Sequence, residues 1–349
     1  MITILANINF ENGLQLPESI NLREVGLRDG LQIERPISTD AKLELLANLA
    51  EAGLSRIEAT AFVSPRAVPA LADAEMVAAE LHNWPQVMFS ALVPNIRGAR
   101  RAVDAGIRHL EYVVSAADGH SMANVRCSTE DALRQVGEIV ELVHAEAGTC
   151  EVIIATAWDC PFDGKVPPER ALAVARRAVE EGADRLCLGD TIGTAAPGRV
   201  AALLSAVSAQ HPEVPLGLHM HNTRGAGLAG VLTALQMGIT DIDASVGGLG
   251  GCPFAPGASG NIATEELVYM CRDSDIDTGC DLDKLITAAR WAQDMVGRTL
   301  PSGILRAGDR RHSRELVHAN ASPEPVLACL GDHYRPQDCV HRPGRRSEI

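Results

Sequence analysis

Short apolar segments alternate with longer segments of helical period along most of the chain. Eight runs rich in Ile, Val and Leu predict buried β-strands, which centre on Ile20–Val25, Arg56–Thr60, Val87–Leu92, His109–Val114, Glu151–Ala155, Arg185–Gly189, Leu216–His221 and Asp241–Val246. Amphipathic helices are predicted between and after them, among others over Thr39–Ala52, Glu130–Ala147, Glu169–Gly182, Pro197–His211, Gly225–Gly238, Glu265–Arg272 and Leu282–Thr299. The chain therefore repeats one strand and one helix in turn.

The ends of the predicted helices carry boundary signals. Ser128 precedes an acidic first turn, as an N-cap residue does. Glycine follows four helical segments, at Gly53, Gly106, Gly182 and Gly238, where it can take the left-handed conformation that ends a helix. Eight strand–helix units predict an α/β protein with a (β/α)8 TIM barrel. A doubly wound open sheet is the main alternative, but no GxGxxG follows the first strand.

Composition divides the 349 residues into three parts. We expect an N-terminal extension over residues 1–19, the barrel with additional C-terminal helices over residues 20–300, and an irregular tail rich in Pro and Arg over residues 301–349. The formal net charge of −14 argues against nucleic acid as a partner. No apolar run approaches the roughly 20 residues that span a bilayer, and the N-terminus lacks the basic start of a secretory signal. We therefore expect a cytoplasmic protein without a membrane partner.

Polar residues at strand ends are the candidates for chemistry, because TIM barrels carry their active sites at the C-terminal ends of the strands. The first strand leads into Arg28, Asp29 and Gln32, and the second contains Glu58. Arg28 could stabilise an anion, since its guanidinium stays charged and its fork fits carboxylates and enolates. The alternative is a purely structural ion pair of Arg28 with Glu58 or Asp29, and both roles could coexist.

Two histidines at the seventh strand suggest a metal site. His219 and His221 are two residues apart, so their side chains point to the same face of the strand. Together with Asp29 they offer the mixed nitrogen and oxygen ligands that suit Mn²⁺, Mg²⁺, Co²⁺ or Zn²⁺. Structural histidines at a barrel mouth are the alternative. Burying a carboxylate beside an arginine is costly, which favours a functional interpretation.

The segment from Ser245 to Glu265 is rich in glycine and holds Cys252 and Asn261. Its composition predicts a loop that passes close to another group, with a flexible surface linker as the alternative. Cys252 could be a nucleophile, a general acid or a core thiol.

Two further strand-end residues, Asp190 and Lys165, are additional candidates. The chain has three lysines and none lies in a predicted strand, so a Schiff-base mechanism is not expected. An aldol-type reaction would then depend on a metal ion.

Five motifs resemble the hydroxymethylglutaryl-CoA lyase family over roughly Asn21–Thr299. They are RDGLQ at Arg28–Gln32, IEATAFVSPR at Ile57–Arg66, LGDTIG at Leu188–Gly193, HMHNT at His219–Thr223 and GLGGCPFAPGASGN at Gly248–Asn261. The resemblance implies a divalent cation, Mg²⁺ or Mn²⁺, and no organic cofactor. It assigns the cation to residues Asp29, His219, His221 and Asn261. The family is often dimeric, so a homodimer is implied as well.

The reaction that the resemblance implies is retro-aldol cleavage of a 3-hydroxy-3-methylglutaryl-CoA-like thioester to acetyl-CoA and a keto acid. Asp29 or His219 would take the proton of the substrate hydroxyl. Arg28, held by Glu58, would stabilise the enolate of acetyl-CoA. Cys252 would protonate that enolate.

Three departures from the family pattern leave the acyl group open. Leu27 replaces a proline, Asn222 and Arg224 replace an Asp and a Tyr, and the fifth strand has Val152, Ile153 and Ile154 where the family has Arg-Gly-Tyr. We expect Gln32, Ile153 and Arg224 to contact the substrate. A positive patch of Arg66, Arg97 and Arg224 would attract an anionic CoA ester.

Three alternatives to the leading function are open. One is a lyase for a related thioester, such as citramalyl-CoA or a bulkier 3-hydroxyglutaryl-CoA. Another is a Claisen-type acyltransferase of the same superfamily, which the cysteine-containing loop argues against. The third is a protein that binds CoA esters without turning them over.

Overall fold

The structure is a computed structural model, and it describes residues 14–251 and 260–310. The chain divides into two compact units, Met1–Ala307 and Gly308–Ile349, and every helix and strand named below belongs to the first. Within the described residues, no helix is both long and apolar enough to cross a membrane.

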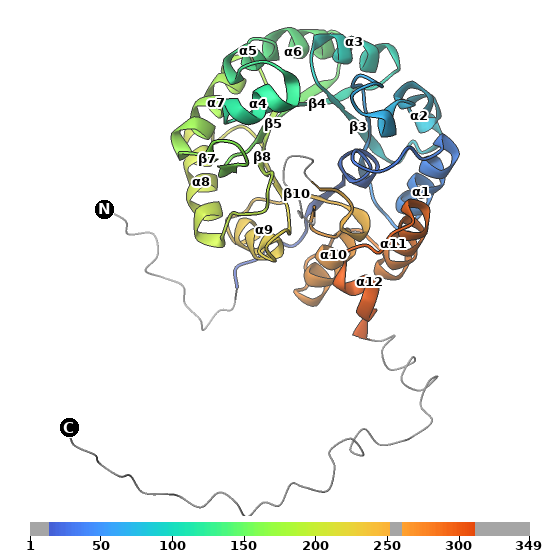
Figure 1. The fold of residues 1–349 in the computed structure, drawn as a ribbon. Helices are drawn as coiled ribbons and strands as arrows, with labels where there is room; N and C mark the ends of the chain where they lie inside the picture. The colour runs from blue at the N-terminus through green and yellow to red at the C-terminus, as the bar shows by residue number, and fades with distance from the viewer. Residues whose placement is uncertain (1–13, 252–259, 311–349) are drawn as a thin grey trace, which may run out of the picture. The chain divides into compact units, whose positions relative to one another are not determined.

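Eight parallel strands close into a barrel in the order β1-β10-β9-β8-β5-β4-β3-β2 (Figure 1). Their bounds are β1 Asn21–Glu24, β2 Arg56–Ala61, β3 Met88–Val93, β4 His109–Ser115, β5 Thr149–Ala155, β8 Arg185–Asp190, β9 Leu216–Met220 and β10 Asp241–Ala244. All eight predicted strands are present. The predicted TIM barrel is confirmed, and the doubly wound sheet is excluded because β1 pairs with β10.

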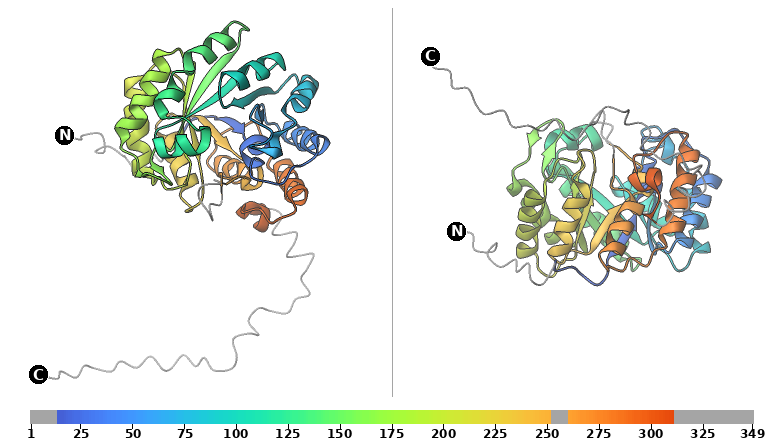
Figure 2. Two further views of the ribbon diagram at one scale, coloured as in Figure 1. Left: turned by 45° about the horizontal axis from the view of Figure 1, so that its top comes forward. Right: turned by 90° about the horizontal axis from the view of Figure 1, so that it is seen from below.

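Helices surround the strands on the outside (Figure 2). Their bounds are α1 Thr39–Glu51, α2 Ala74–Glu80, α3 Ile96–Asp104, α4 Asp118–Val125, α5 Thr129–Leu133, α6 Val136–His144, α7 Pro168–Glu180, α8 Pro197–Gln210, α9 Gly227–Gln236, α10 Thr264–Asp273, α11 Leu282–Val296 and α12 Gly303–Ala307. The two-stranded hairpin of β6 Asp159–Cys160 and β7 Gly164–Lys165 follows β5.

Helix boundaries follow the predicted local signals. Ser128 caps α5, and its side chain accepts a hydrogen bond from the backbone of Asp131. The four glycines predicted to end helices all have positive φ, for example 98° at Gly53 and 92° at Gly106.

Two predictions of local structure are wrong. The segment Glu130–Ala147 is not one helix, because α5 ends at Leu133 and α6 begins at Val136. Lys165 does lie in a strand, in the short hairpin β6–β7, but its side chain is exposed there.

The barrel strands place apolar and polar side chains on opposite faces. Outward-facing residues pack under the helices, and Tyr112, for instance, donates its hydroxyl hydrogen to the carbonyl oxygen of Ala132 on α5. Several inward-facing positions are charged instead of apolar, among them Arg23, Glu111 and Asp243. The barrel interior is therefore an ionic network that lies beneath the C-terminal mouth.

Candidate active site

Two segments that are distant in sequence bring Asp29, His219 and His221 together at the C-terminal mouth of the barrel. One ligand atom from each residue lies within 4.8 Å of those from the other two, and all three residues are buried. We call these three residues the Asp–His–His cluster. His219 and His221 come from the end of β9, and their ring centroids are 5.2 Å apart.

A π-helical turn, Gly26–Gly30, presents Arg28 and Asp29 to the mouth. The buried carboxylate of Glu24 fixes the start of this turn, because its Oε1 accepts hydrogen bonds from the backbone of Gly26 at 2.7 Å and of Val246 at 2.8 Å. Its other oxygen accepts a hydrogen bond from Thr264 at 2.6 Å. One carboxylate thus ties the end of β1 to both arms of the glycine-rich loop.

Asn261 joins the cluster from the far arm of that loop. Its backbone forms an isolated antiparallel bridge with His221. Its Nδ2 donates to Asp29 Oδ2 at 2.7 Å and to the carbonyl oxygen of Leu249 at 2.9 Å. No hydrogen bond to its amide oxygen from a described residue is present.

Gly250 passes directly against this arrangement, as the glycine-rich composition predicts. Its φ is 120°, and a Cβ built on it would lie 2.5 Å from Asn261 Nδ2 and 3.3 Å from Asp29 Oδ2. Any side chain at this position would enter the space beside the cluster, so the close approach requires glycine.

His219 is oriented from below by Asp243, since its Nδ1 lies 3.1 Å from Asp243 Oδ2. Burial opposes ionisation of Asp243, but Arg23 and the contact with His219 together hold the pKa of that carboxyl below its usual range. An ionised Asp243 accepts the Nδ1 hydrogen, which leaves the Nε2 lone pair of His219 available at the mouth.

Asp29 is ionised despite its burial. Burial alone would raise the pKa of its carboxyl, but the positive charge of Arg28 and the interaction with His221 hold that pKa well below its usual range. Its Oδ1 accepts hydrogen bonds from Arg28 Nη1 at 2.7 Å and from Gln32 Nε2 at 2.9 Å. Its Oδ2 lies 3.8 Å from His221 Nε2.

Arg28 is held between two carboxyl groups. Its Nε lies 2.6 Å from Glu58 Oε1, and its Nη1 contacts Asp29. Burial disfavours its charge, but Glu58 and Asp29 outweigh burial and raise the pKa of the guanidinium above its ordinary value. Its remaining nitrogen, Nη2, bonds no described residue.

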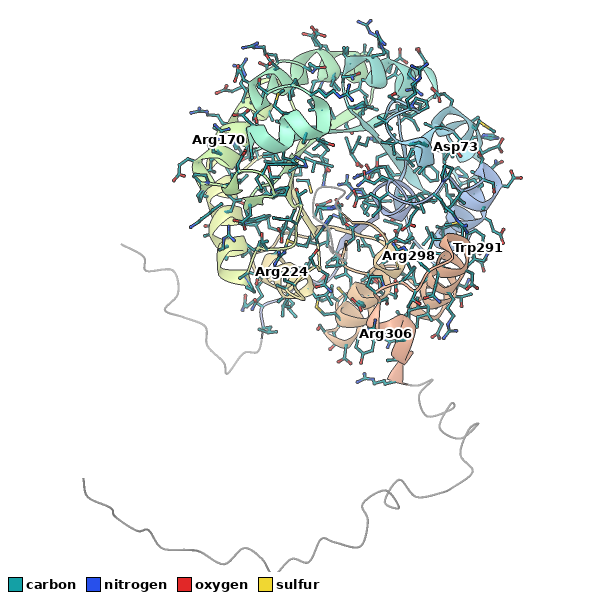
Figure 3. All side chains as sticks on the ribbon, in the orientation of Figure 1. Asp73, Arg170, Arg224, Trp291, Arg298 and Arg306 are labelled. Atoms are coloured by element: carbon teal, nitrogen blue, oxygen red, sulfur yellow. The ribbon has the colours of Figure 1, made fainter. Side chains whose placement is uncertain are left out.

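The other expected site residues differ in their placement. Gln32 contacts Asp29 directly. Ile153 lies two residues after the inward-facing Glu151 on β5, so it faces the interior nearer the mouth. Arg224 is exposed beside α9, and its Nη1 donates to the backbone of Ile192 at 2.7 Å (Figure 3). Cys252 lies outside the described residues.

The additional candidates do not join the cluster. The carboxylate of Asp190 accepts backbone hydrogen bonds from Thr194 and Ala195, so it caps its own loop. The side chains of Arg66 and Arg97 are exposed.

Three buried charged residues, Asp243 on β10, Glu24 on β1 and Glu265 on α10, were not identified from the sequence as contributors to the site. Asp243 supports His219, while Glu24 and Glu265 accept backbone hydrogen bonds beneath the glycine-rich loop. A charged residue in a run that is otherwise apolar is a signal for such a role, because burying it requires partners.

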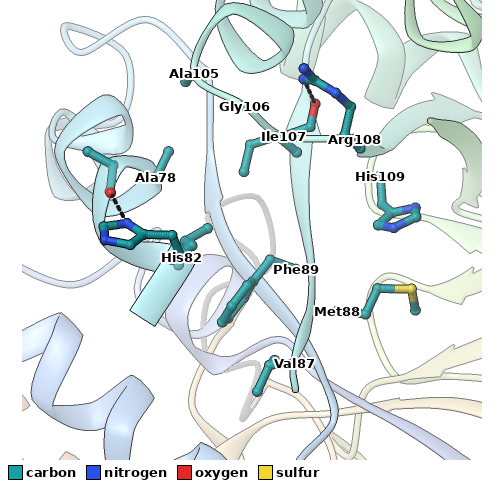
Figure 4. Close-up of a pocket in the computed structure, with 12 residues that line it drawn as sticks. Ala78, His82, Val87, Met88, Phe89, Ala105, Gly106, Ile107, Arg108 and His109 are labelled. Carbon is teal, nitrogen blue, oxygen red and sulfur yellow. Dashed lines mark hydrogen bonds between the residues drawn. The ribbon is translucent and has the colours of Figure 1, made fainter. Parts of the chain in front are cut away.

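A hollow of about 440 Å³ lies elsewhere on the barrel (Figure 4). It is lined by the beginnings of β3 and β4, including Met88 and His109, and by residues near α2 and α3. These are the N-terminal ends of the strands, and none of the cluster residues lines the hollow. It is therefore separate from the candidate active site.

The donor set at the mouth fits a divalent metal ion. Asp29, His219 and His221 supply one carboxylate and two imidazoles, and the side-chain amide of Asn261 lies against Asp29. His221 Nδ1 is buried without a hydrogen-bond partner among the described residues. Mixed oxygen and nitrogen donors of this kind suit first-row divalent metals.

Comparison with known proteins agrees with this geometry. The family model described as HMGL-like matches residues 19–291. Hydroxymethylglutaryl-CoA lyase YngG of Bacillus subtilis is 42% identical over 291 residues, which cover 83% of this chain and 97% of that protein. The (R)-citramalyl-CoA lyase of Chloroflexus aurantiacus is 41% identical over 302 residues, covering 83% and 95% of the two chains.

A solved structure extends the similarity to three dimensions. The HMG-CoA lyase of Acinetobacter baumannii, in complex with coenzyme A and 3-methylmalate, superimposes with a TM-score of 0.81 at 40% identity, covering 88% of this chain and 98% of that one. The barrel, the cluster at its mouth and these similarities lead to one assignment: this chain belongs to the HMGL-like family.

Proposed function

We propose that this protein is a divalent-metal-dependent carbon–carbon lyase that cleaves a 3-hydroxy-3-methylglutaryl-CoA-like thioester to acetyl-CoA and a keto acid. The observation that carries the proposal is the buried Asp–His–His cluster with Arg28 directly beside it. A metal-ligand set next to a guanidinium with one free nitrogen suits a reaction that begins with an alkoxide and ends with an enolate.

Asp29, His219, His221 and Asn261 would hold the ion, which we propose to be Mg²⁺ or Mn²⁺. When bound, the ion would lower the pKa of the substrate hydroxyl and orient the substrate carboxylate. Burial of the three cluster residues keeps bulk water away from these donors.

The hydroxyl proton has two candidate acceptors, Asp29 and His219. The pKa of Asp29 lies well below its usual range, so its carboxylate is a weak base. Asp243 lies behind the ring of His219 and would offset the charge that the ring gains if it takes the proton. Because Asp243 occupies Nδ1, His219 has a single free lone pair, which serves either as ligand or as base at any one time.

Loss of the hydroxyl proton lets the C2–C3 bond break, with its electron pair passing to the thioester as an enolate. Arg28 would stabilise the enolate oxygen through Nη2, while Glu58 and Asp29 keep its guanidinium in place. We assign the final protonation of C2 to Cys252. The carbinol carbon leaves as the ketone of the keto acid.

The relatives and the residues expected beside the substrate support the proposed substrate class. The relatives named above are lyases for hydroxymethylglutaryl-CoA and (R)-citramalyl-CoA, and one relative structure holds coenzyme A with 3-methylmalate. Ile153 would place an apolar wall beside the acyl substituent, and Gln32 would contact the substrate from the side of Asp29. Arg224, whose guanidinium also bonds the loop after β8, stays a proposed substrate contact.

Incubation of the full chain with Mn²⁺ and one thioester at a time tests the proposal. A lyase releases acetyl-CoA from 3-hydroxy-3-methylglutaryl-CoA or citramalyl-CoA without any added keto acid, as measured by chromatography. An acyltransferase instead consumes acetyl-CoA, and only when a keto acid is supplied. Release of acetyl-CoA from none of these thioesters would overturn the proposal, and Cys252→Ser should remove most of the turnover of a true lyase.

A further inference from the structure

Beneath the Asp–His–His cluster, a single guanidinium meets three carboxylates inside the barrel. Arg23 on β1 is only 6% exposed. Its Nη1 lies 2.7 Å from Glu111 Oε1, and its Nη2 lies 2.7 Å from Glu151 Oε1. Its Nε and Nη2 hold the two oxygens of Asp243 at 2.8 and 2.9 Å. None of these four residues belongs to the Asp–His–His cluster.

Asp243 connects this guanidinium to the metal-binding half of the site. The two-pronged contact with Arg23 fixes the plane of the Asp243 carboxylate. The same Oδ2 that accepts from Arg23 also contacts His219 Nδ1 at 3.1 Å. The orientation of the His219 ring therefore depends on where Arg23 holds Asp243.

We infer that Arg23 is a positioning residue for the active site. It holds the carboxylate of Asp243, which in turn orients the ring of His219. The inference rests on the proposed function, because it assigns His219 to the metal ion. A planar fork that serves three carboxylates at once is a property of arginine, so lysine should replace it only in part.

Arg23 could instead serve only to fill the barrel interior. Arg56 provides a matched control for that role. Arg56 lies at the N-terminal end of β2 and pairs with Asp241 at 2.5 Å, but it does not contact Asp243. Replacing either arginine with methionine removes one cation from the barrel. Only the Arg23 replacement should disturb His219.

The first experiment measures Mn²⁺ binding to the full chain by calorimetry, without substrate. Arg23→Met should weaken Mn²⁺ binding about 10- to 100-fold, the range found when a group that orients a metal ligand is lost. Arg23→Lys should fall between Arg23→Met and the wild type. Arg56→Met should bind Mn²⁺ within about threefold of the wild type. If Arg23→Met does not fold, Arg23→Lys and Arg56→Lys provide the same comparison.

A double-mutant cycle tests the path through Asp243. Asp243→Asn should weaken Mn²⁺ binding on its own, and adding Arg23→Met should change the affinity by less than about threefold. A full additional loss in the double variant would refute the path through Asp243. Unchanged Mn²⁺ affinity in both Arg23 variants, or a loss no larger than that of Arg56→Met, would overturn the inference.

A metal-free readout keeps this test separate from the proposed function. Nitrogen NMR of ¹⁵N-histidine-labelled chain, assigned with His219→Asn, reports which ring nitrogen of His219 carries the hydrogen. The wild type should have the hydrogen on Nδ1, and Arg23→Met should show a mixture of both tautomers. An unchanged tautomer would contradict the inference even if the wild type proves to be a lyase. Absence of acetyl-CoA release by the wild type would refute the proposed function alone.

Discussion

Replacing Gly250 with alanine probes the contact between the glycine-rich loop and the Asp–His–His cluster. The added Cβ would lie 2.5 Å from Asn261 Nδ2, whereas ordinary contacts of a Cβ begin near 3.4 Å. Asn261 would have to move by about 1 Å, because Gly250 has φ of 120° and its backbone cannot relax into a common conformation. That shift would break the hydrogen bond to Asp29 and the one to the Leu249 carbonyl.

The expected cost has two parts. The positive φ costs about 1–3 kcal/mol for a residue with a side chain. The two displaced hydrogen bonds of Asn261 add about 1 kcal/mol each. Gly106→Ala is the matched control, because Gly106 has φ of 92° and nothing lies within 4 Å of a Cβ built there. Gly250→Ala should therefore lose about 2 kcal/mol more than Gly106→Ala.

Urea unfolding followed by circular dichroism measures the stability of both variants, and calorimetry measures their affinity for Mn²⁺. We expect Gly250→Ala to bind Mn²⁺ at least about tenfold more weakly than the wild type, and Gly106→Ala to bind it equally well. Equal stability losses in the two variants together with unchanged Mn²⁺ affinity would refute the reasoning. Gly250 would then not lie against Asn261.

Three further outcomes are expected. Arg28→Met should lower kcat about 100- to 1000-fold in an acetyl-CoA release assay, because it removes the donor for the enolate oxygen; a change confined to KM would contradict that role. Removal of metal with EDTA should abolish turnover. Mn²⁺ added back at about 100 times its Kd should raise the free energy of unfolding by about 2.7 kcal/mol. An unchanged unfolding curve would argue against the ion site. Burial raises the pKa of Glu24 to about 7. The folded state therefore binds this proton more tightly than the unfolded state, and the resulting stability is present below pH 4.5 and lost as the pH rises to about 7. Urea titrations at pH 5 and pH 8 measure how much the free energy of unfolding falls between the two pH values. Glu24→Gln should make this fall smaller by up to about 3 kcal/mol, whereas exposed Glu75→Gln should leave it unchanged.

The arrangement of strands and helices was predictable because it depends on local patterns. Apolar runs with regular spacing located all eight barrel strands, and polar caps such as Ser128 and glycines such as Gly53 marked helix ends. The segment Glu130–Ala147 was predicted as one helix because its period continues across the break. Periodicity alone does not show where a chain bends to pack against its neighbours.

The residues at the strand ends were also predictable, because the barrel rule places every strand's C-terminal end at one mouth. Asp29, His219, His221 and Asn261 could therefore be expected near one another before any coordinates were known. The donor atoms that these side chains offer are set by residue type and do not depend on the fold. The sequence by itself thus determined the barrel, the mouth and the donor types.

Only the tertiary structure decided what surrounds these residues. Arg224 was expected at the substrate, and its hydrogen bond to the backbone of Ile192 could not be read from the sequence. The ionic network of Arg23 joins strands that are up to 220 residues apart, and no local pattern specifies such pairs. Side-chain contacts across a closed barrel depend on strand register and on shared partners, which are properties of the folded chain as a whole.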